Sequence, residues 1–203
     1  GGAMGVYGGK SGVFGLSLPS ALTGALGGKP CQLTDGGRTY YCEPLFRAGR
    51  VYVFGGGHVS QALVPALTAV DFRCVVLEDR PEFCRPELFP GVEETRLVDN
   101  ARLADFVTVD ERDYVVVMTR GHKDDQAVQA QMLRTPAHYI GVIGSRRKTA
   151  GVFARLREEG FTDADLARIT TPIGLDIKAE TPAEIAVSIA AQLIQVRAER
   201  AGH

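Results

Sequence analysis

Short apolar runs rich in Val, Ile and Tyr alternate along the chain with longer stretches in which apolar residues recur every three or four positions. The runs predict strands, and the longer stretches predict helices. Five strands are expected, at residues 51–54, 74–77, 95–98, 114–118 and 139–143. Four helices are expected among them, at residues 59–70, 100–106, 124–133 and 146–159. This alternation predicts an α/β fold of the Rossmann-like, doubly wound kind, with helices on both faces of a parallel sheet.

Helix-end signals occur in the last third of the chain. Gly160 follows the predicted helix at residues 146–159, where a residue with a left-handed backbone often ends a helix. A further helix is expected to start at Pro182, because Thr181 and Glu184 form a capping box around it. Its apolar stripe can pack on the sheet and consists of Ile185, Ile189, Leu193 and Val196.

The first quarter of the chain has a different composition from the rest. Residues 1–49 hold 13 of the 24 glycines but only six of the 47 charged residues. No secondary structure is predicted before residue 38, and residues 40–45 lead into the first strand. We therefore expect a reduced N-terminal region at residues 1–49, rich in loops or with a small β-structure, and a Rossmann-like domain at residues 50–203.

Composition excludes several functions. The 23 Lys and Arg residues against 24 Asp and Glu leave no basic excess for non-specific nucleic-acid binding. No apolar stretch approaches the roughly 18 residues of a membrane span, and no signal-peptide pattern is present. The four cysteines form no CxxC pair, so neither a metal site nor a disulfide framework is predicted. Isolated thiols fit a reducing compartment, and we expect a cytoplasmic protein.

A glycine-rich turn, FGGGHVS, follows the first predicted strand. Gly55, Gly57 and Ser60 match the dinucleotide fingerprint, with serine in place of the third glycine. Gly55 suits the tight turn, and Gly57 allows a pyrophosphate to approach the next helix, which begins at Val59 directly after His58. The simpler interpretation is a glycine turn that only packs a helix on a sheet.

An acidic residue stands where nucleotide-binding proteins often hold a ribose. Glu78 ends the second predicted strand, 21 residues after Gly57. This favours a nucleotide without a 2′-phosphate. Asp79 and Arg80 leave an alternative open, because an arginine there could pair with a 2′-phosphate or another anionic group.

Polar segments also follow the later strands, whose carboxyl ends border the ligand crevice in such folds. They are TRGHKDD, which Thr119 opens, IGSRRK and TPIGLDI. Their cationic side chains favour an anionic ligand larger than a simple nucleotide, and Ser145 is placed to cap a helix. The alternative is that the RRK run is a solvated helix face and that His122 pairs with Asp124 or Asp125.

Six blocks in one order resemble the C-terminal domain of the xanthine dehydrogenase accessory factor family, XdhC/CoxI: EPL, FGGGHVSQAL, LEDRPEF, TRGHKDDQ, YIGVIGSRRK and TPIGLDIKAETPAEIAVSIAAQLI. The resemblance runs from Glu43 to about Arg197. It implies a Rossmann-like domain that binds the molybdopterin cofactor and assists its completion or insertion into an apo molybdenum hydroxylase. The residues that the resemblance places at the ligand are Gly55, Gly57, His58, Arg120, Gly121, His122, Asp125, Gly144, Ser145, Arg146, Lys148, Pro172, Ile173 and Gly174.

Two features depart from the family pattern. Lys178 stands where the family usually has glycine, which adds a cation or blocks a close backbone approach. Residues 1–49 lack the Cys-Cys-Gly-Gly run of longer members, so a role in handling sulfur is not transferred to this chain.

The leading hypothesis is therefore a non-catalytic or weakly catalytic maturation factor whose partners are a cofactor and an apo molybdenum hydroxylase. No nucleophile elbow, Walker loop or HExxH motif is present, which disfavours covalent and metal-hydrolytic enzymes. The glycine turn and Glu78 keep open an NAD-dependent oxidoreductase, with NAD or another dinucleotide as cofactor. A nucleotide-sensing regulatory module is the third possibility, and the apolar C-terminal helix also suggests a homodimer.

Overall fold

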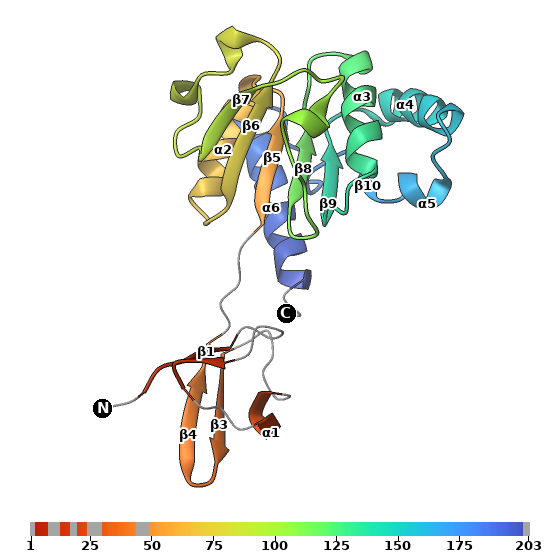
Figure 1. Ribbon diagram of the computed structural model, residues 1–203. Helices are drawn as coiled ribbons and strands as arrows, with labels where there is room; N and C mark the ends of the chain where they lie inside the picture. The colour runs from red at the N-terminus through yellow and green to blue at the C-terminus, as the bar shows by residue number, and fades with distance from the viewer. Residues whose placement is uncertain (1–2, 8–12, 17–19, 24–29, 44–48, 201–203) are drawn as a thin grey trace. The chain divides into compact units, whose positions relative to one another are not determined.

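The computed structural model describes residues 3–7, 13–16, 20–23, 30–43 and 49–200 (Figure 1). The chain divides into two compact units. One consists of residues 1–47 with 199–203, and the other consists of residues 48–198. The larger unit thus starts two residues before the Rossmann-like domain that the sequence predicts.

Six parallel strands form the sheet of the larger unit. They are β5 (Arg50–Phe54), β6 (Arg73–Glu78), β7 (Glu94–Leu97), β8 (Tyr114–Val117), β9 (Tyr139–Val142) and β10 (Ile169–Thr170). Their order in the sheet is β10-β9-β8-β5-β6-β7. Numbered along the chain, this is the 3-2-1-4-5-6 order of the Rossmann fold, so the predicted fold is confirmed. The order reverses between β5 and β8, where folds of this kind open a crevice for ligands.

Helices cover both faces of this sheet (Figure 1). α2 (His58–Thr68) and α6 (Pro182–Arg200) lie on one face, and α3 (His122–Leu133) and α4 (Arg146–Glu158) lie on the other. Successive residues of a strand point to opposite faces. Val51 and Val53 accordingly pack in the core under α2 and α6, while Tyr52 and Phe54 pack in the core under α3 and α4.

The predicted helix ends are confirmed. Gly160 has a φ of +92°, and the N–H of Phe161 donates to the carbonyl of Leu156 at 3.1 Å, which closes α4 in a Schellman arrangement. At the start of α6, the N–H of Thr181 donates to Glu184 Oε2 at 2.9 Å, and the N–H of Glu184 donates to Thr181 Oγ1 at 3.2 Å. Both halves of the capping box are therefore formed.

The apolar stripe of α6 packs on the sheet. Ile189 and Leu193 are fully buried in the core that α6 shares with α2, and Ile185 and Val196 pack against this core. The sheet thus occupies the apolar surface on which the expectation of a homodimer was based.

One predicted helix is wrong. Residues 100–106 contain only the 3-10 turn Leu103–Asp105. The Gln131 side chain holds this segment, because it donates to the Asn100 carbonyl at 2.8 Å and accepts from the N–H of Leu103 at 2.8 Å. β10 was not predicted, because two residues are too short to show a period, and the turn helix α5 (Asp163–Leu166) was missed as well.

The smaller unit contains short elements. β1 (Val6–Tyr7) pairs with β2 (Val13–Phe14), and a short helix, α1, spans Ser20–Thr23. β3 (Cys31–Asp35) and β4 (Arg38–Cys42) form an antiparallel hairpin, although no strand was predicted before residue 38. Its turn residues Gly36 and Gly37 both have positive φ, which a two-residue hairpin turn of type I′ requires.

Within the described part of the chain, no helix combines the length and the apolar character that a membrane span needs.

Candidate functional site

The turn after β5 requires glycine at its first position. Gly55 has a φ of +105°, and its N–H donates to the carbonyl of Leu77 at 2.8 Å. A Cβ at this position would lie 2.4 Å from the carbonyl oxygen of Met118. The Ser60 hydroxyl donates to the Gly55 carbonyl at 2.5 Å, so this serine also fixes the turn. The turn therefore lies in close contact with the carboxyl ends of both β6 and β8.

The next two glycines differ in what surrounds them. A Cβ at Gly56 would lie 2.6 Å from the carbonyl oxygen of Phe83, so the packed protein leaves no space for a side chain there. A Cβ at Gly57 would have no described atom within 4 Å. Gly57 is the N-cap of α2, with extended backbone and no side-chain cap, and the first turn of α2 contains no acidic residue. The helix N-terminus is therefore open to an anion, as the glycine motif predicts.

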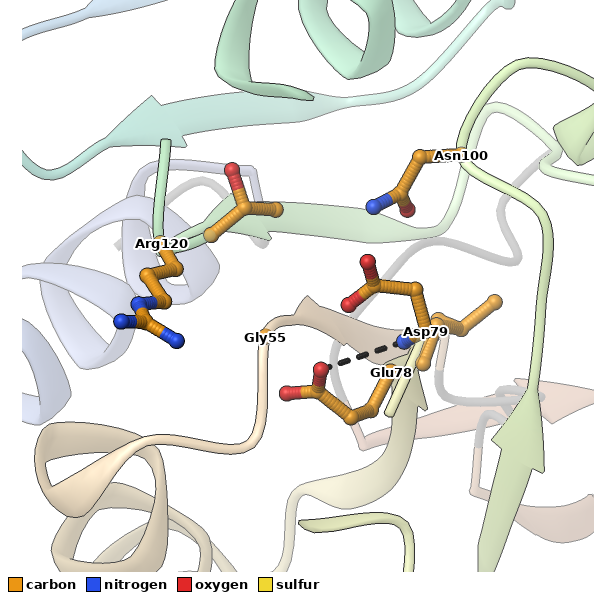
Figure 2. A pocket seen from close by; sticks show the side chains of 7 residues that line it. Gly55, Glu78, Asp79, Asn100 and Arg120 are labelled. Atoms are coloured by element: carbon orange, nitrogen blue, oxygen red, sulfur yellow. Dashed lines mark hydrogen bonds between the residues drawn. The ribbon is translucent and has the colours of Figure 1, made fainter. Parts of the chain in front are cut away.

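A shallow pocket lies beside this turn, with about 180 Å³ of space that includes the open solvent in front of it (Figure 2). Its lining comes from the ends of β5, β6 and β8 and from the loop after β7. The lining residues are Gly55, Leu77, Glu78, Asp79, Asn100, Thr119 and Arg120. Five of the residues predicted from the sequence are thus brought together, and Leu77 and Asn100 are added to them.

Glu78 is held by the protein itself. Its side chain is only 2% exposed and turns back toward the glycine turn (Figure 2). Oε2 accepts from the N–H of Gly56 at 2.5 Å and from Arg80 Nη2 at 3.1 Å. Oε1 accepts from the backbone N–H groups of Asp79 and Arg80 at 3.2 and 3.1 Å, and from Arg80 Nε at 2.9 Å.

These contacts set the charge of Glu78. Burial by itself would raise the pKa of this carboxyl, but the hydrogen bonds from Arg80, Asp79 and Gly56 outweigh it and lower the pKa to about 2. Glu78 is therefore ionised at neutral pH and is paired with Arg80. The guanidinium of Arg80 also lies over the Phe83 ring, 4.0 Å from its centroid.

Asp79 and Asn100 present polar groups to the pocket itself (Figure 2). The Asp79 side chain is 47% exposed, and the neighbouring Glu78 carboxylate raises its pKa, first through a side-chain hydrogen bond. Asn100 is only 9% exposed, and its amide faces the space in front of Asp79 (Figure 2). Among the described residues, no hydrogen bond of the Asn100 side-chain amide is found. No buried side-chain nitrogen or oxygen of the described residues lacks a partner, so the Asn100 amide is in contact with the solvent of the pocket.

The TRGH segment forms the opposite side of the pocket. The Thr119 hydroxyl donates to Asp125 Oδ1 at 2.5 Å, and Gly121 is the N-cap of α3. Arg120 is exposed at the pocket, and no ion pair joins it to another residue that the structure describes. The side chain of His122 lies outside the described residues.

The predicted second anion loop lies at the carboxyl end of β9, away from the pocket lining. Ser145 caps α4 as predicted, because its hydroxyl accepts from the N–H of Lys148, although at a long 3.4 Å. Gly144 precedes this cap, and the Lys148 side chain is exposed. The side chain of Arg146 lies outside the described residues.

The PIG segment has a packing role. The N–H of Ile173 donates to the Val142 carbonyl at 3.0 Å, and the Ile173 side chain is buried. Gly174 has a φ of +98°, its N–H donates to Gln192 Oε1 at 2.8 Å, and a Cβ there would lie 2.3 Å from Ser188 Oγ. These contacts attach the segment to β9 and α6. Pro172, Ile173 and Gly174 do not line the described pocket.

Asn100 is the polar pocket residue that sequence reasoning missed. A signal was present, since the polar pair Asp99 and Asn100 follows β7 at the same edge of the sheet as the other loops. The prediction of a helix at residues 100–106 placed Asn100 in that helix and not in a loop at the ligand crevice. Among the described residues, no three His, Cys, Asp or Glu side chains are grouped in a way that could hold a metal ion.

The strand order, the glycine turn and the pocket at the switch point place the protein in the class of Rossmann-like α/β domains. Residues 51–193 match the family model described as the XdhC Rossmann domain, and the chain belongs to this family.

Two curated relatives and one solved structure are similar to the chain. The uncharacterized protein YqeB of Escherichia coli strain K12 is 33% identical over 149 residues, which are 73% of this chain and 27% of that protein. A protein of Bacillus subtilis strain 168, named as a probable xanthine dehydrogenase subunit, is 28% identical over 148 residues, which are 73% of this chain and 43% of that protein. The crystal structure of a xanthine dehydrogenase from Bacillus halodurans superposes with a TM-score of 0.68 at 31% identity, covering 80% of this chain and 45% of that one. The chain thus spans less than half of each of these proteins.

Proposed function

We propose that this protein is an accessory factor for a molybdenum hydroxylase of the xanthine dehydrogenase type. It binds the molybdopterin cofactor, in a phosphate-bearing or dinucleotide form, and assists its completion or insertion into the apoenzyme. Two similar proteins bear the name xanthine dehydrogenase, which supports this target class. The observation that carries the proposal is the pocket at the switch point, which lies beside a helix N-terminus that is open to anions and is lined by the exposed cation of Arg120.

The chemistry of the pocket fits such a ligand. A pyrophosphate would lie on the N-terminus of α2, where Gly57 leaves space and backbone N–H groups face outward. Arg120 supplies an exposed cation for a further phosphate or another anionic group. Asp79 and Asn100 supply acceptors and donors for hydroxyl groups.

These contacts suit a protein that holds a cofactor and passes it on. When bound, the cofactor supplies the metal-centred chemistry that the target enzyme uses. The residues of this chain bind its phosphates at the turn, orient it across the switch point and keep it non-covalently attached. Ionic contacts at an exposed edge allow release when a partner protein covers the same edge.

Isothermal titration with molybdopterin, and separately with the apo molybdenum hydroxylase, tests the proposal. We expect binding to both. Arg120→Ala should weaken cofactor binding about tenfold or more, because a charge-assisted contact is lost. Arg157→Ala removes an equal charge from the exposed side of α4, outside the pocket lining, and serves as the matched control. Binding to neither molybdopterin nor the apoenzyme refutes the proposal.

An NAD-dependent oxidoreductase would use the same turn and pocket, so the two functions must be separated by turnover. A dehydrogenase would hold NAD⁺ and reduce it in the presence of a substrate, which the absorbance of the reduced nicotinamide reports. Our proposal expects no such turnover, with or without the apoenzyme. Substrate-dependent reduction of NAD⁺ would instead establish the oxidoreductase.

A further inference from the structure

We propose that Asp79 and Asn100 recognise the ribose hydroxyls of the bound nucleotide, while Glu78 fixes the glycine turn and makes no contact with the ligand. The proposal rests on the nucleotide-type binding proposed above. The motif spacing assigns the ribose contact to Glu78. We assign it instead to the neighbouring Asp79 and to Asn100, which lies in the loop after β7.

Glu78 has no capacity left for a ribose. A carboxylate offers about four lone-pair directions, and five N–H donors of the protein already point at this one. With 2% of its side chain exposed, it is closed to a ligand hydroxyl. Rotating it toward the pocket would leave the Gly56 N–H and the Arg80 guanidinium without their acceptor in a buried position. Glu78 is therefore a positioning residue.

Asp79 and Asn100 have the complementary properties. Asp79 is half exposed in the pocket, and a carboxylate can accept from both hydroxyls of a vicinal diol. Asn100 is nine-tenths buried, and its amide faces the same space as the Asp79 carboxylate (Figure 2). An amide can donate to one hydroxyl oxygen while it accepts from another group. Because the Asn100 amide is accessible at the pocket, a bound diol can replace water as its hydrogen-bond partner.

The same arrangement selects against a 2′-phosphate. Arg80, the residue that could have paired with this phosphate, is held by Glu78 and by the Phe83 ring, and its Nε also lies 3.9 Å from Asp79 Oδ1. The charge that faces the pocket at this point is the negative charge of Asp79, which repels a phosphate. The alternative that the sequence left open at Arg80 is therefore decided in favour of an unphosphorylated ribose.

Calorimetric titration of the full chain with ADP, 2′-deoxy-ADP, NAD⁺ and NADP⁺ tests the assignment. Wild type should bind ADP about tenfold more tightly than 2′-deoxy-ADP, and NAD⁺ more tightly than NADP⁺. Asp79→Asn should weaken ADP binding about tenfold to a hundredfold and remove most of the discrimination against 2′-deoxy-ADP. Asn100→Ala should weaken ADP binding by a smaller factor.

Glu82→Gln is the matched control, because Glu82 is an exposed acidic residue near the site that does not line the pocket. It should bind ADP like wild type. If wild type binds neither ADP nor NAD⁺, both the nucleotide proposal and the ribose assignment fail. If wild type binds them and Asp79→Asn keeps the same affinity and discrimination, only the ribose assignment is overturned.

The β-hairpin of the smaller unit carries a second, independent inference. We propose that Cys31 and Cys42 form a reversible disulfide. The β3–β4 register places these residues directly opposite one another. Opposite residues of antiparallel strands have Cα atoms about 4.5–5.5 Å apart, which lies within the range that a disulfide requires. Both side chains are partly exposed, so a small oxidant can reach them.

The two thiols are also close enough to influence each other's ionisation. After burial, the causes that raise the pKa of Cys42 are the charge of Cys31 and a hydrogen bond between the two side chains. Oxidised glutathione supplies the oxidant in a balanced exchange. One protein thiol attacks its disulfide and releases a first glutathione thiol, and the second protein thiol then displaces the other. The protein loses two electrons and two protons, and two glutathione thiols form.

Peptide mapping after equilibration in glutathione buffers tests this pair. Trypsin cuts after Arg38, between the two cysteines, so a disulfide appears as one linked pair of peptides. The linked pair should accumulate as the oxidised fraction rises and vanish on return to reduced buffer. Cys31→Ser should abolish it, while Cys84→Ser, at another partly exposed thiol, should leave it unchanged. Separate glutathione adducts on Cys31 and Cys42, or two unmodified thiols in oxidising buffer, would overturn the proposal.

Discussion

Replacing Glu78 with glutamine should destabilise the domain strongly, although the two side chains have nearly the same shape. Glutamine has no charge to pair with Arg80, and its NH₂ group would face N–H donors in place of one carboxylate oxygen. The carboxyl is almost fully buried, so solvent does not weaken these interactions. The variant therefore leaves buried donors without an acceptor.

The magnitude follows from the pKa of Glu78. Lowering it from 4.5 to about 2 corresponds to about 3 kcal/mol of folding stability at neutral pH. Removing one member of a buried ion pair typically costs about 3–5 kcal/mol, which agrees with this figure. Glu78→Gln should thus lose about 3 kcal/mol, or about 6–12 °C in Tm for a chain of this size.

Urea unfolding followed by circular dichroism measures this loss, and Asp79→Asn is the matched control. Asp79 is half exposed and lies beside a like charge, so its neutralisation should change stability by no more than about 0.5 kcal/mol. If Glu78→Gln loses less than about 1 kcal/mol, or no more than Asp79→Asn does, the buried network does not hold the turn as we describe it.

Four further outcomes are expected. The stabilisation from Glu78 should be complete above pH 4.5 and should decrease as the pH falls toward 2, because the unfolded state binds this proton more readily. When the free energy of unfolding is measured against pH in this range, its slope should be smaller in Glu78→Gln. Gly55→Ala should lower the free energy of unfolding by about 3 kcal/mol or more, because of the positive φ and the clash with the Met118 carbonyl. Gly57→Ala should keep wild-type stability in urea but lose nucleotide affinity, because only the space for a ligand is changed. Lys178→Gly should stabilise the protein by about 1 kcal/mol, because Lys178 has a φ of +61°; no gain in urea midpoint would show that its backbone is not strained. Thr181→Ala should lose about 1 kcal/mol through the helix cap, measured in the same way, and an unchanged midpoint would show that the cap adds no stability.

Much of the fold and the glycine turn of the candidate site follow from the sequence because their signals are local. Gly55 lies at a strand end and Ser145 and Thr181 at helix starts, and in each case the spacing of a few neighbouring residues is enough to assign the position. Lys178 shows the same locality. The family pattern indicates glycine there, and the structure gives the reason, since the backbone at this position is left-handed.

The direction of a side chain is not local information. The motif spacing places a carboxylate near the ribose, but it does not distinguish Glu78 from Asp79. That choice depends on the N–H of Gly56, which the turn brings to 2.5 Å from Glu78 Oε2 across 22 residues of chain. The position of Asn100 also depends on a distant residue. The Gln131 side chain fixes the backbone of its loop through hydrogen bonds to the Asn100 carbonyl and the Leu103 N–H.

By itself, the sequence determined five of the six strands of the sheet, the four helices that cover it, the Rossmann-like class and the glycine turn, because periodicity and capping act over a few residues. The tertiary structure alone decided which of the polar residues at the strand ends remain available to a ligand. The Glu78 carboxylate already accepts hydrogen bonds from the protein, and Ile173 and Gly174 bond to neighbouring elements. Asp79, Asn100 and Arg120 instead face the pocket. The physical reason is that hydrogen-bond donors and acceptors from distant segments of the chain meet only in the folded protein. Which polar groups are already paired is therefore decided by folding.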